Sequence, residues 1–521
     1  MKSVLPSTLE QSLFDVAATR LIEAREAAAL PPHALMDRAG LAVAQLALAL
    51  APHARCIWVA AGPGNNGGDG LQAALHLRQW GKAVHVSLIG HAAALPADAA
   101  HALQRAQAAG VVIGGPTPSE LSPHDLAIDA LLGIGASRPP QGALAESIRQ
   151  LNALACPVLA VDVPSGLNAD MGNPLGDDCI NAAHTLALLT LKPGLFTASG
   201  RDHAGQVWFD ALGLDLAADA PQARLGASQL TMTRSLRRHA QHKGSFGDVA
   251  VVGGAVGMAG AALLAARAAL AAGAGRVFVE LLDHADHANN SMAVDLLHPE
   301  LMLRAAWSGG PASAISASTV VCGCGGGDAV RAPLPRLLGL AARLVLDADA
   351  LNAVASDTGL QTLLRQRAAR GLQTVLTPHP LEAARLLGVG TAEVQADRLR
   401  AAQALADRFA CCVVLKGSGS VIAAPFEVPR INATGNAALA TAGTGDVLAG
   451  WLAGLWAQSI SGSSKNSGKS SDTSSDKSSG ESSAFTAALR AVRSHGAAAE
   501  PPPPGPLCAS ALIEALGRSA R

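Results

Sequence analysis

Short apolar runs alternate along this chain with longer stretches whose apolar residues recur at helical spacing. Residues 57–60 form one such run, with the length and branching of a buried parallel strand, and the pattern of residues 71–80 predicts a helix after it. The same order returns in the second half, where residues 249–252 form a predicted strand and residues 263–272 a predicted helix. This regular alternation predicts α/β folds built on largely parallel sheets.

The length of the chain predicts more than one domain. Its 521 residues exceed the size at which one hydrophobic core keeps growing, and 49% of them are hydrophobic, so we expect two large domains. We place these at residues 1–220 and 221–521, with a linker over residues 215–240. Residues 461–483 are rich in Ser and contain no apolar residue, so we expect a disordered insertion there.

Composition excludes several classes of partner. The formal net charge of −1 argues against nucleic acid or an anionic membrane as the main partner. No apolar run is long enough to span a membrane, and the N-terminus lacks the apolar region of a signal peptide. The eight Cys include no CxxC pair with zinc spacing, so we expect reduced thiols in a cytoplasmic protein.

A glycine-rich segment follows the first of these predicted strands. Residues 62–70 read GPGNNGGDG and contain five Gly, two Asn and one Asp. A strand, a glycine loop and a helix in this order are typical of phosphate or nucleotide binding at the carboxyl end of a sheet. The segment matches neither GxGxxG nor a Walker loop, and Asn and Gly are also ordinary turn formers. We favour a binding loop because these residues are so dense.

Further polar side chains of the first half lie just after predicted strands. The carboxyl ends of parallel strands meet at one rim of a sheet, where ligands bind, so we expect these side chains to converge. Their amide, carboxylate and hydroxyl oxygens suit a hard cation better than a transition metal. The set consists of Asn66, Asp69, Asp129, Asp162, Ser165 and Lys192.

The second half contains a compact candidate for phosphate chemistry. Residues 442–446 read AGTGD and precede an apolar helical run. Free backbone N–H groups at a helix N-terminus bind anions, and we interpret Asp446 as a base that takes a proton from a hydroxyl beside that anion. Asp is also a favoured N-cap residue, so on this motif alone a simple helix cap is the alternative.

Two other segments of the second half are candidates for ligand contact. Residues 416–420 read KGSGS and form a small basic glycine turn, suited to a nucleotide phosphate or ribose. His379 stands between Pro378 and Pro380 at the end of a predicted strand. The residue before a proline is biased to extended backbone, so His379 is held on a stiff turn and is a ligand candidate.

Together these motifs resemble one family. They are GNNGGDG (64–70), DALLGIG (129–135), DVPSGL (162–167), GMAGAA (257–262), TPHP (377–380), LKGSGS (415–420), NATGN (432–436) and AGTGD (442–446). On these motifs the chain resembles the bifunctional NAD(P)H-hydrate repair enzymes over nearly its whole length, except the Ser-rich segment. The resemblance implies a Rossmann-like epimerase domain fused to a ribokinase-like dehydratase domain. The first would interconvert R and S hydrates of NADH and NADPH, and the second would return the S hydrate to NAD(P)H at the expense of a nucleotide.

For the first domain, the resemblance implies a hydrate site and a potassium site. Asp162 is the acid/base candidate for epimerisation, and Lys192 is a weaker polar candidate. K⁺ would be held by Asn66, Asp129 and Ser165, in line with the hard cation expected above. The implied hydrate contacts are Asn65, Asn66, Gly67, Gly68, Asp69, Gly133, Ile134, Gly135, Ala136, Ser137, Arg138, Pro139 and Asp162.

For the second domain, the resemblance implies phosphorylation followed by elimination. Asp446 would deprotonate the hydrate hydroxyl while the turn at residues 443–445 stabilises the transferring phosphoryl group. Phosphate then leaves more easily than hydroxide, which explains why a dehydration consumes a nucleotide. The implied phosphoryl donor is ADP or ATP, bound with Mg²⁺. Bacterial fused forms favour ADP, and a homo-oligomer is the family expectation. The implied hydrate contacts are Ala261, Gly325, His379 and Asp446, and the implied nucleotide contacts are Lys416, Gly417, Ser418, Gly419, Ser420 and Gly445.

The chain departs from the family pattern at two places. Residues 323–327 read GCGGG where a GPGLG-like turn is usual, so we expect a floppier loop. Leu381 follows TPHP where Gly is usual, which we expect to be tolerated.

Two other functions compete with hydrate repair. One is a ribokinase-like kinase for a vitamin precursor or sugar, whose product keeps the phosphate. The other is a first domain that binds without catalysing. The GNNGGDG segment argues against the first, and the complete set of Asn66, Asp129, Asp162 and Ser165 argues against the second.

Overall fold

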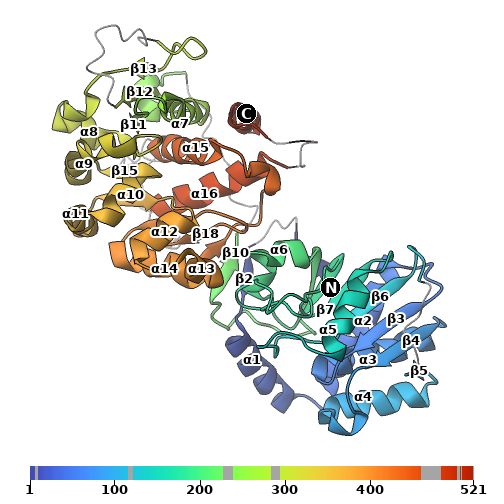
Figure 1. Cartoon of the computed structure of the whole chain (residues 1–521). Coiled ribbons are helices and arrows are strands. Elements are labelled where there is room, and N and C mark those ends of the chain that lie inside the picture. The colour runs from blue at the N-terminus through green and yellow to red at the C-terminus, as the bar shows by residue number, and fades with distance from the viewer. Residues whose placement is uncertain are drawn as a thin grey trace, which may run out of the picture. The chain divides into compact units, whose positions relative to one another are not determined.

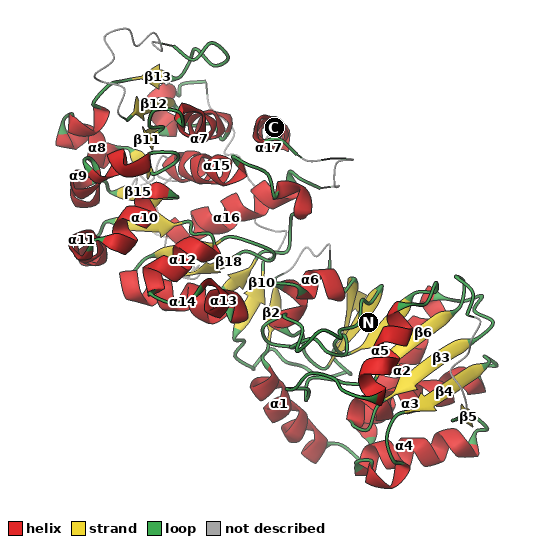
Figure 2. Cartoon of the chain, viewed as in Figure 1, coloured by secondary structure: helices red, strands yellow, loops and turns green. Residues whose placement is uncertain are grey.

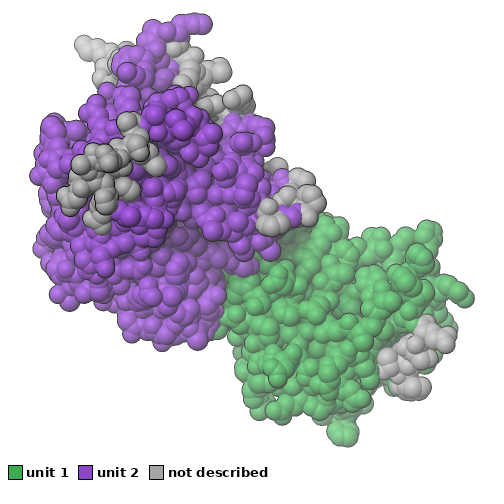
Figure 3. Space-filling model, turned by 45° about the horizontal axis from the view of Figure 1, so that its top comes forward, with its two compact units in different colours: residues 1–227 green, residues 228–521 purple. Residues whose placement is uncertain are grey.

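The chain folds as two compact units. The computed structural model describes residues 1–5, 10–114, 121–226, 239–282, 294–458, 483–500, 505 and 507–519. The units are Met1–Ala227 and Ser228–Arg521, coloured separately in Figure 3. Each contains a sheet flanked by helices (Figure 2), which confirms the predicted α/β class.

The first unit is built on an eight-stranded sheet. Its strands are β1 (Lys2–Ser3), β3 (Ile57–Ala61), β4 (Val84–Leu88), β5 (Val112–Ile113), β6 (Leu126–Ala130), β7 (Val158–Val161), β8 (His184–Leu188) and β9 (Gln206–Asp210). They lie in the order β1-β9-β8-β7-β6-β3-β4-β5, and only β1 is antiparallel to its neighbour. The chain proceeds outward from β3 to β5, returns to β6 beside β3, and then proceeds the other way. This reversal confirms the doubly wound sheet, and ligands bind at the carboxyl ends of strands at such a point.

Helices cover both faces of this sheet, as the strands require. They are α1 (Val16–Ala29), α2 (Ala34–Leu50), α3 (Asn65–Gln79), α4 (Ala97–Ala108), α5 (Ala143–Asn152) and α6 (Gly200–His203). In β3, Ile57 and Val59 join the core under α2, α3 and α4, whereas Trp58 joins the core under α5. A strand buried on both faces is apolar at every position, which is why residues 57–60 form a continuous apolar run.

The predicted loop conformation over residues 62–70 is wrong from Asn65 onward, because these residues form the first turns of α3. Their role in binding stays a prediction. The glycines there are needed for close packing rather than for a turn. A Cβ on Gly67 would lie 2.0 Å from the carbonyl oxygen of Gly62, and one on Gly70 would lie 2.5 Å from Cβ of Ala130. Dense glycine therefore indicates here a helix pressed against the sheet.

The second unit contains a larger, mostly parallel sheet. Its strands are β11 (Asp248–Gly253), β12 (Arg276–Leu281), β13 (Met302–Leu303), β14 (Thr319–Cys322), β15 (Arg343–Leu346), β16 (Gln373–Leu376), β17 (Cys412–Leu415), β18 (Val421–Ala423) and β19 (Arg430–Ile431). They lie in the order β13-β12-β11-β14-β15-β16-β17-β18-β19. Pairing is parallel from β13 to β17 and antiparallel for β18 and β19.

The helices of the second unit form two layers on this sheet. One core contains buried residues of α7 (Ala259–Ala271), α15 (Thr444–Gln458), α16 (Ser483–Ala497) and α17 (Ala509–Ser519). The other contains residues of α8 (Ala312–Ala317), α9 (Leu334–Leu340), α10 (Asp349–Ser356), α11 (Thr358–Ala369), α12 (Pro380–Leu387), α13 (Thr391–Ala396) and α14 (Arg398–Phe409). Figure 1 shows α7, α15 and α16 side by side.

Small residues bring α15 close to α7. A Cβ on Gly450 would lie 1.9 Å from the carbonyl oxygen of Ala265, and one on Gly454 would lie 2.6 Å from that of Ala269. The two helices therefore meet backbone to backbone. This close approach fixes the first turn of α15, which carries Asp446.

Two other predicted segments differ from the structure, and a third is not tested by it. The predicted strand over residues 186–191 ends at Leu188, because Leu189 takes a left-handed backbone with φ 63°. The predicted linker over residues 215–240 contains β10 (Ala223–Leu225), which pairs with β2 (Gln11–Leu13). The predicted disordered insertion at 461–483 lies outside the described residues except Ser483, which begins α16. Within the described residues, no helix is both long and apolar enough to cross a membrane.

Candidate functional site

A cavity of about 1150 Å³ lies within the first unit. It is lined by residues that follow β3, β6, β7 and β8, together with residues of α1 and the start of α2. The strands on either side of the reversal thus contribute to one pocket, as expected for a doubly wound sheet.

Most of the predicted hydrate contacts line this cavity. They are Asn65, Asn66, Asp69, Gly133, Ile134, Gly135, Ala136, Ser137, Arg138, Pro139 and Asp162, and Lys192 lines it as well. Gly67 and Gly68 do not line it, since they pack against Gly62 and Met36. Asp129 and Ser165 also lie outside the lining and are fully buried.

Asp162 is held in place by Lys192. The Lys192 ammonium donates to Asp162 Oδ1, and it also donates to the carbonyl oxygens of Leu188 at 2.7 Å and Thr190 at 3.0 Å. Lys192 is only 1% exposed, so its charge has little water to stabilise it and depends on this carboxylate. Asp162 itself has φ 68°, a left-handed conformation that Asp tolerates better than most residues. The ion pair therefore fixes the position of a carboxylate at the cavity wall.

Two of the predicted potassium ligands, Asp129 and Ser165, form a fully buried hydrogen-bonded pair, and the third, Asn66, lines the cavity. Ser165 donates its N–H to Asp129 Oδ2 at 2.8 Å and its hydroxyl to Asp129 Oδ1 at 2.6 Å. Burial raises the pKa of Asp129 to about 6, although the hydrogen bonds from Ser165 and Leu131 lower it. The side-chain nitrogen of Asn66 is buried without a hydrogen-bond partner. Turning that amide over would place an unpartnered oxygen there, which is a suitable ligand for a hard cation.

Two further acids line the cavity, Asp69, which the sequence predicted, and Glu23, which it did not. Glu23 lies on α1 and Asp69 on α3, and both line the cavity near Asp162. Burial raises the pKa of Glu23, and the negative charge of Asp162 raises it further. Burial raises the pKa of Asp69 well above its usual value, again with a contribution from Asp162. Sequence reasoning missed Glu23 because α1 carries no glycine motif and does not follow a strand of the sheet.

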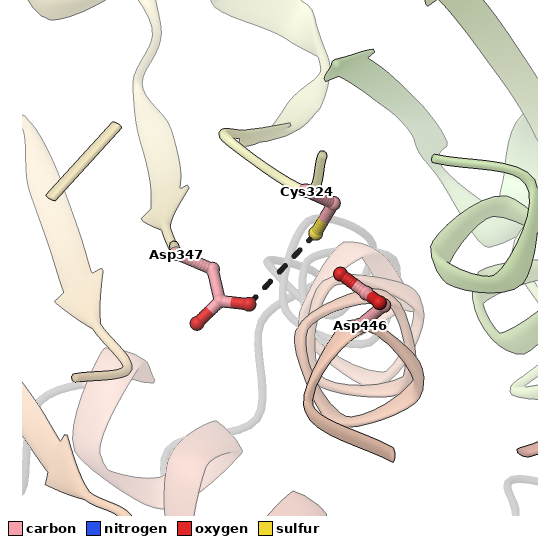
Figure 4. Close-up of side chains that lie close together, drawn as sticks. All are labelled: Cys324, Asp347 and Asp446. Carbon is pink, nitrogen blue, oxygen red and sulfur yellow. Dashed lines mark hydrogen bonds between the residues drawn. The ribbon is translucent and has the colours of Figure 1, made fainter. Parts of the chain in front are cut away.

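The second unit brings together three side chains from separate segments. Cys324 follows β14, Asp347 follows β15, and Asp446 lies in the first turn of α15. One ligand atom of each lies within 4.8 Å of the others, and Figure 4 shows them pointing toward one another. Cys324 Sγ lies 3.9 Å from Asp347 Oδ2. Mg²⁺ prefers oxygen ligands, so the carboxylates of this cluster suit it and the thiol does not.

Asp347 is oriented by two donors. Lys416 Nζ and the Thr377 hydroxyl each donate to Asp347 Oδ1 at 2.7 Å. Oδ2 is left to face Cys324 and Asp446. Sequence reasoning gave Asp347 no role, because its partners Thr377 and Lys416 follow strands far along the chain.

The environment of Asp446 suits a base. Burial raises its pKa to about 6, the negative charge of Asp347 raises it further, and Cys324 and Lys416 lower it. A base with a pKa near neutrality is ionised at neutral pH and still accepts a proton readily. His495 lies close by, and its Nε2 donates a hydrogen bond to the Thr444 carbonyl at 2.9 Å. Burial lowers the pKa of His495 to about 4, so the ring is neutral.

Four other residues that were predicted to contact a ligand in the second unit lie next to one another in two pairs. A Cβ on Gly325 would lie 2.8 Å from Cβ of Ala261, and one on Gly445 would lie 3.3 Å from Lys416 Nζ. The turn at residues 416–420 is closed by the Ser420 hydroxyl, which donates to the Gly417 carbonyl at 3.0 Å. Gly417 has a φ of 135°, a backbone conformation that favours glycine. Ser418 and Gly419 complete the turn.

Buried Arg398 supports this turn from below. Its Nη2 donates to the carbonyls of Leu415 at 3.3 Å and Lys416 at 3.1 Å. Burial lowers the pKa of Arg398 to about 10, so it still carries its charge at neutral pH. Sequence reasoning missed Arg398 because it begins α14, without a local motif.

His379 has a structural partner as well as its predicted contact. It is the N-cap of α12, where Nδ1 accepts from the N–H of Leu381 at 3.1 Å and of Glu382 at 3.4 Å. Glu382 Oε2 accepts from the His379 N–H at 2.8 Å, which completes a capping box. The ring is 46% exposed, but its Nε2 lies 3.1 Å from Glu382 Oε1, so both ring nitrogens have partners within α12. The predicted contact of His379 with the hydrate stays a prediction.

Comparison with known proteins agrees with this division of the chain. Residues 32–194 match the family described as YjeF-related protein N-terminus, and residues 249–501 match NAD(P)H-hydrate dehydratase. The bifunctional NAD(P)H-hydrate repair enzyme of Escherichia coli is 37% identical over 447 residues, which are 84% of this chain and 83% of that protein. The enzyme of Leishmania braziliensis is 38% identical over 460 residues, covering 81% and 80%.

Solved structures are similar mainly to one part of the chain. The ADP/ATP-dependent NAD(P)H-hydrate dehydratase of Bacillus subtilis, co-crystallised with ATP and Mg²⁺, is 26% identical with a TM-score of 0.42. The match covers 56% of this chain and 95% of that protein. Two family matches in sequence, together with relatives similar over most of their own length, lead to one conclusion. The chain belongs to the family of bifunctional NAD(P)H-hydrate repair enzymes.

Proposed function

We propose that the cavity of the first unit is where R and S hydrates of NADH and NADPH are interconverted, and that the cluster around Asp446 dehydrates the S hydrate. One observation carries the proposal: each unit contains a carboxylate that neighbouring side chains contact at its candidate site. Asp162 is paired with Lys192 in one, and Asp446 faces Cys324 and Asp347 in the other.

The cavity of the first unit suits a dinucleotide in size and charge. Its volume of about 1150 Å³ is at the upper end for small-molecule sites, as a ligand with two nucleotides requires. Arg20 and Arg138 line it, and neither makes a hydrogen bond or ion pair with another described residue. Their guanidinium groups suit the diphosphate of the hydrate. Asp162 then acts on the altered nicotinamide ring.

A potassium ion fits the polar group formed by Asn66, Asp129 and Ser165. The support is the buried Asn66 amide without a partner and the carboxylate and hydroxyl beside it. When bound, such an ion supplies positive charge below the cavity, which favours the ionised form of Asp129. The residues of this chain orient the loop after β6 whether or not the ion takes part.

The cluster in the second unit suits phosphorylation of a hydroxyl. Asp446 takes the hydroxyl proton of the hydrate, and the N–H groups at the start of α15 face the transferring phosphoryl group. Lys416 adds a positive charge beside Gly445 and the turn at residues 416–420, which we assign to the nucleotide. Mg²⁺ with ADP or ATP supplies the phosphoryl group. Ala261, Gly325 and His379 then contact the hydrate.

A pair of substitutions tests the assignment of the two sites. Asp162→Asn keeps a residue that tolerates φ 68° and should abolish R/S exchange while dehydration of the S hydrate continues. Asp446→Asn should abolish dehydration while R/S exchange continues. The assay follows NADH absorbance with a mixture of both hydrates and with ADP or ATP in separate reactions. Loss of both activities in either folded variant would contradict the two-site assignment.

The same assay separates repair from its rivals. Conversion of both hydrates by the wild type supports two activities, and the faster reaction identifies the phosphoryl donor. Recovery of the S hydrate alone would make the first unit a binding module. A stable phosphorylated product without NADH would indicate a kinase. We also propose a cytoplasmic location and a homo-oligomer, which fractionation and light scattering test.

A further inference from the structure

Helix α1 is fixed against the rim of the cavity by its first turns. The side chain of Asp15 caps it, accepting from the N–H of Ala18 at 2.7 Å, and Asp170 Oδ1 accepts from the N–H of Val16 at 2.8 Å. The hydroxyls of Thr19 and Thr190 share a buried hydrogen bond of 2.7 Å. These contacts tie α1 to the segment that leads to Lys192.

Glu23 lies one helical turn beyond Thr19. Residues four positions apart share a helix face, so the face that meets Thr190 also presents Glu23 to the cavity. Glu23 makes no hydrogen bond or ion pair with another described residue. It is a half-buried carboxyl without a partner on the wall of a ligand cavity, which is a common setting for a catalytic acid.

Asp162 and Glu23 therefore differ in their surroundings. Asp162 accepts a hydrogen bond from the Lys192 ammonium. Glu23 has no such cation bonded to it, and burial together with the charge of Asp162 raises its pKa. Lys192 and Arg20 lower that pKa, and Asp98 raises it. Two carboxyls in such different surroundings, one bonded to a cation and one without a partner, are suited to act as base and acid.

Exchange of the hydrate epimers needs one acid and one base. Water that adds to a ring double bond next to nitrogen places its hydroxyl on the carbon beside that nitrogen. This carbon can invert by opening of the ring at the C–N bond and reclosure, or by breaking of the C–O bond and its formation again from the other face. The second route, which takes up oxygen from water, is the one that needs a separate acid and base at the hydroxyl. The leaving hydroxyl needs a proton, and the water that attacks must lose one.

We propose that Glu23 is the acid of the epimerase centre and that Asp162 is its base. Glu23 gives its proton to the hydroxyl, the C–O bond breaks, and the ring nitrogen donates its electron pair to form a C=N⁺ bond and a molecule of water. A water then attacks the other face of that carbon, the C=N⁺ electron pair returns to nitrogen, and Asp162 takes the proton. The reverse reaction exchanges the two roles. This inference rests on the proposed epimerase function.

Asp69 is the competing acid of the same cavity. Burial raises its pKa well above the usual value, so we expect it to hold its proton and to donate a hydrogen bond. A catalytic acid must release its proton and regain it in each turnover. Glu23, on a helix whose other face is exposed, meets that requirement better.

The test compares Glu23→Gln with Glu26→Gln on the same helix. Glu26 is bonded to Arg25 and does not line the cavity, so it serves as the matched control. Without nucleotide, R/S exchange is followed by chromatography in water labelled with oxygen-18. We expect Glu23→Gln to slow exchange and label uptake together by roughly 10²- to 10⁴-fold. Glu26→Gln should match the wild type, and all variants should dehydrate the S hydrate at the wild-type rate.

A pH profile separates catalysis from a structural role. Exchange by the wild type should fall as pH rises through the pKa of Glu23, because the acid must be protonated, and Glu23→Gln should lack this decline. Wild-type exchange rates in Glu23→Gln would overturn the proposal, as would exchange without label uptake. Slow exchange in Asp69→Asn with normal exchange in Glu23→Gln would assign the acid to Asp69. No exchange by wild-type protein that still dehydrates would instead refute the epimerase function.

Discussion

Substitution of Gly67 by Ala tests whether the glycine-rich segment is packed helix or flexible loop. A Cβ at this position would lie 2.0 Å from the carbonyl oxygen of Gly62 and 2.9 Å from its carbonyl carbon and nitrogen. These are backbone atoms, which cannot rotate away. The helix must therefore shift relative to the turn after β3.

The expected magnitude follows from two opposing effects. Overpacking of this kind costs about 1–3 kcal/mol, and contact with backbone favours the upper end. Ala is a better helix former than Gly by about 1 kcal/mol. The net loss of about 2 kcal/mol corresponds to a roughly 30-fold change in the equilibrium for local opening.

Amide hydrogen exchange measures this change segment by segment in the whole chain. We expect exchange of peptides from β3 and α3 to be roughly 30-fold faster in Gly67→Ala, with no change in the second unit. Gly64→Ala is the matched control, because nothing lies within 4 Å of a Cβ there and its φ of −110° suits any residue. The loss of Gly as N-cap should cost less than about 1 kcal/mol. Slower exchange in Gly67→Ala than in the wild type would refute the packing argument.

Three further predictions concern charged groups. The rate of dehydration should fall about tenfold per pH unit below about pH 6, because Asp446 must be ionised to act and its raised pKa places the loss of ionisation there. A constant rate down to pH 5 would exclude Asp446 as the base. Lys192→Met should destabilise the first unit by about 3–5 kcal/mol in urea unfolding by leaving Asp162 unpaired, and an unchanged midpoint would contradict this. Arg398→Met should raise the KM for the nucleotide roughly tenfold at similar kcat. The variant loses hydrogen bonds worth about 1.5–3 kcal/mol to the backbone next to Gly417. A change confined to kcat would argue against Arg398 as a support of the nucleotide-binding turn.

The sequence predicted the fold class, and most of the hydrate contacts it predicted line the cavity, because both depend on local pattern. Strands such as β3 are buried on both faces and therefore apolar throughout, and polar residues after parallel strands meet at one rim. Asp162 and Lys192 were both found in this way, although the ion pair between them was not.

Other features depend on distant packing and leave little local signal. Gly67 is required by the carbonyl of Gly62, a contact that glycine content alone does not distinguish from a turn. Glu23 reaches the cavity only because Thr19 meets Thr190, 171 residues along the chain. Arg398 supports residues 415 and 416 from the start of another helix. No spacing rule relates such positions.

The left-handed backbone of Asp162 constrains which residues can ever occupy that position. With φ 68°, a β-branched or bulky side chain would be strained, whereas Asn and Gly adopt this backbone at little cost once Lys192, which would lose its partner, is replaced as well. A lineage that abandoned epimerisation while keeping the first unit folded would therefore be expected to drift to Asn or Gly at this site. The residue found there would distinguish descendants that only bind their ligand from those that still transform it.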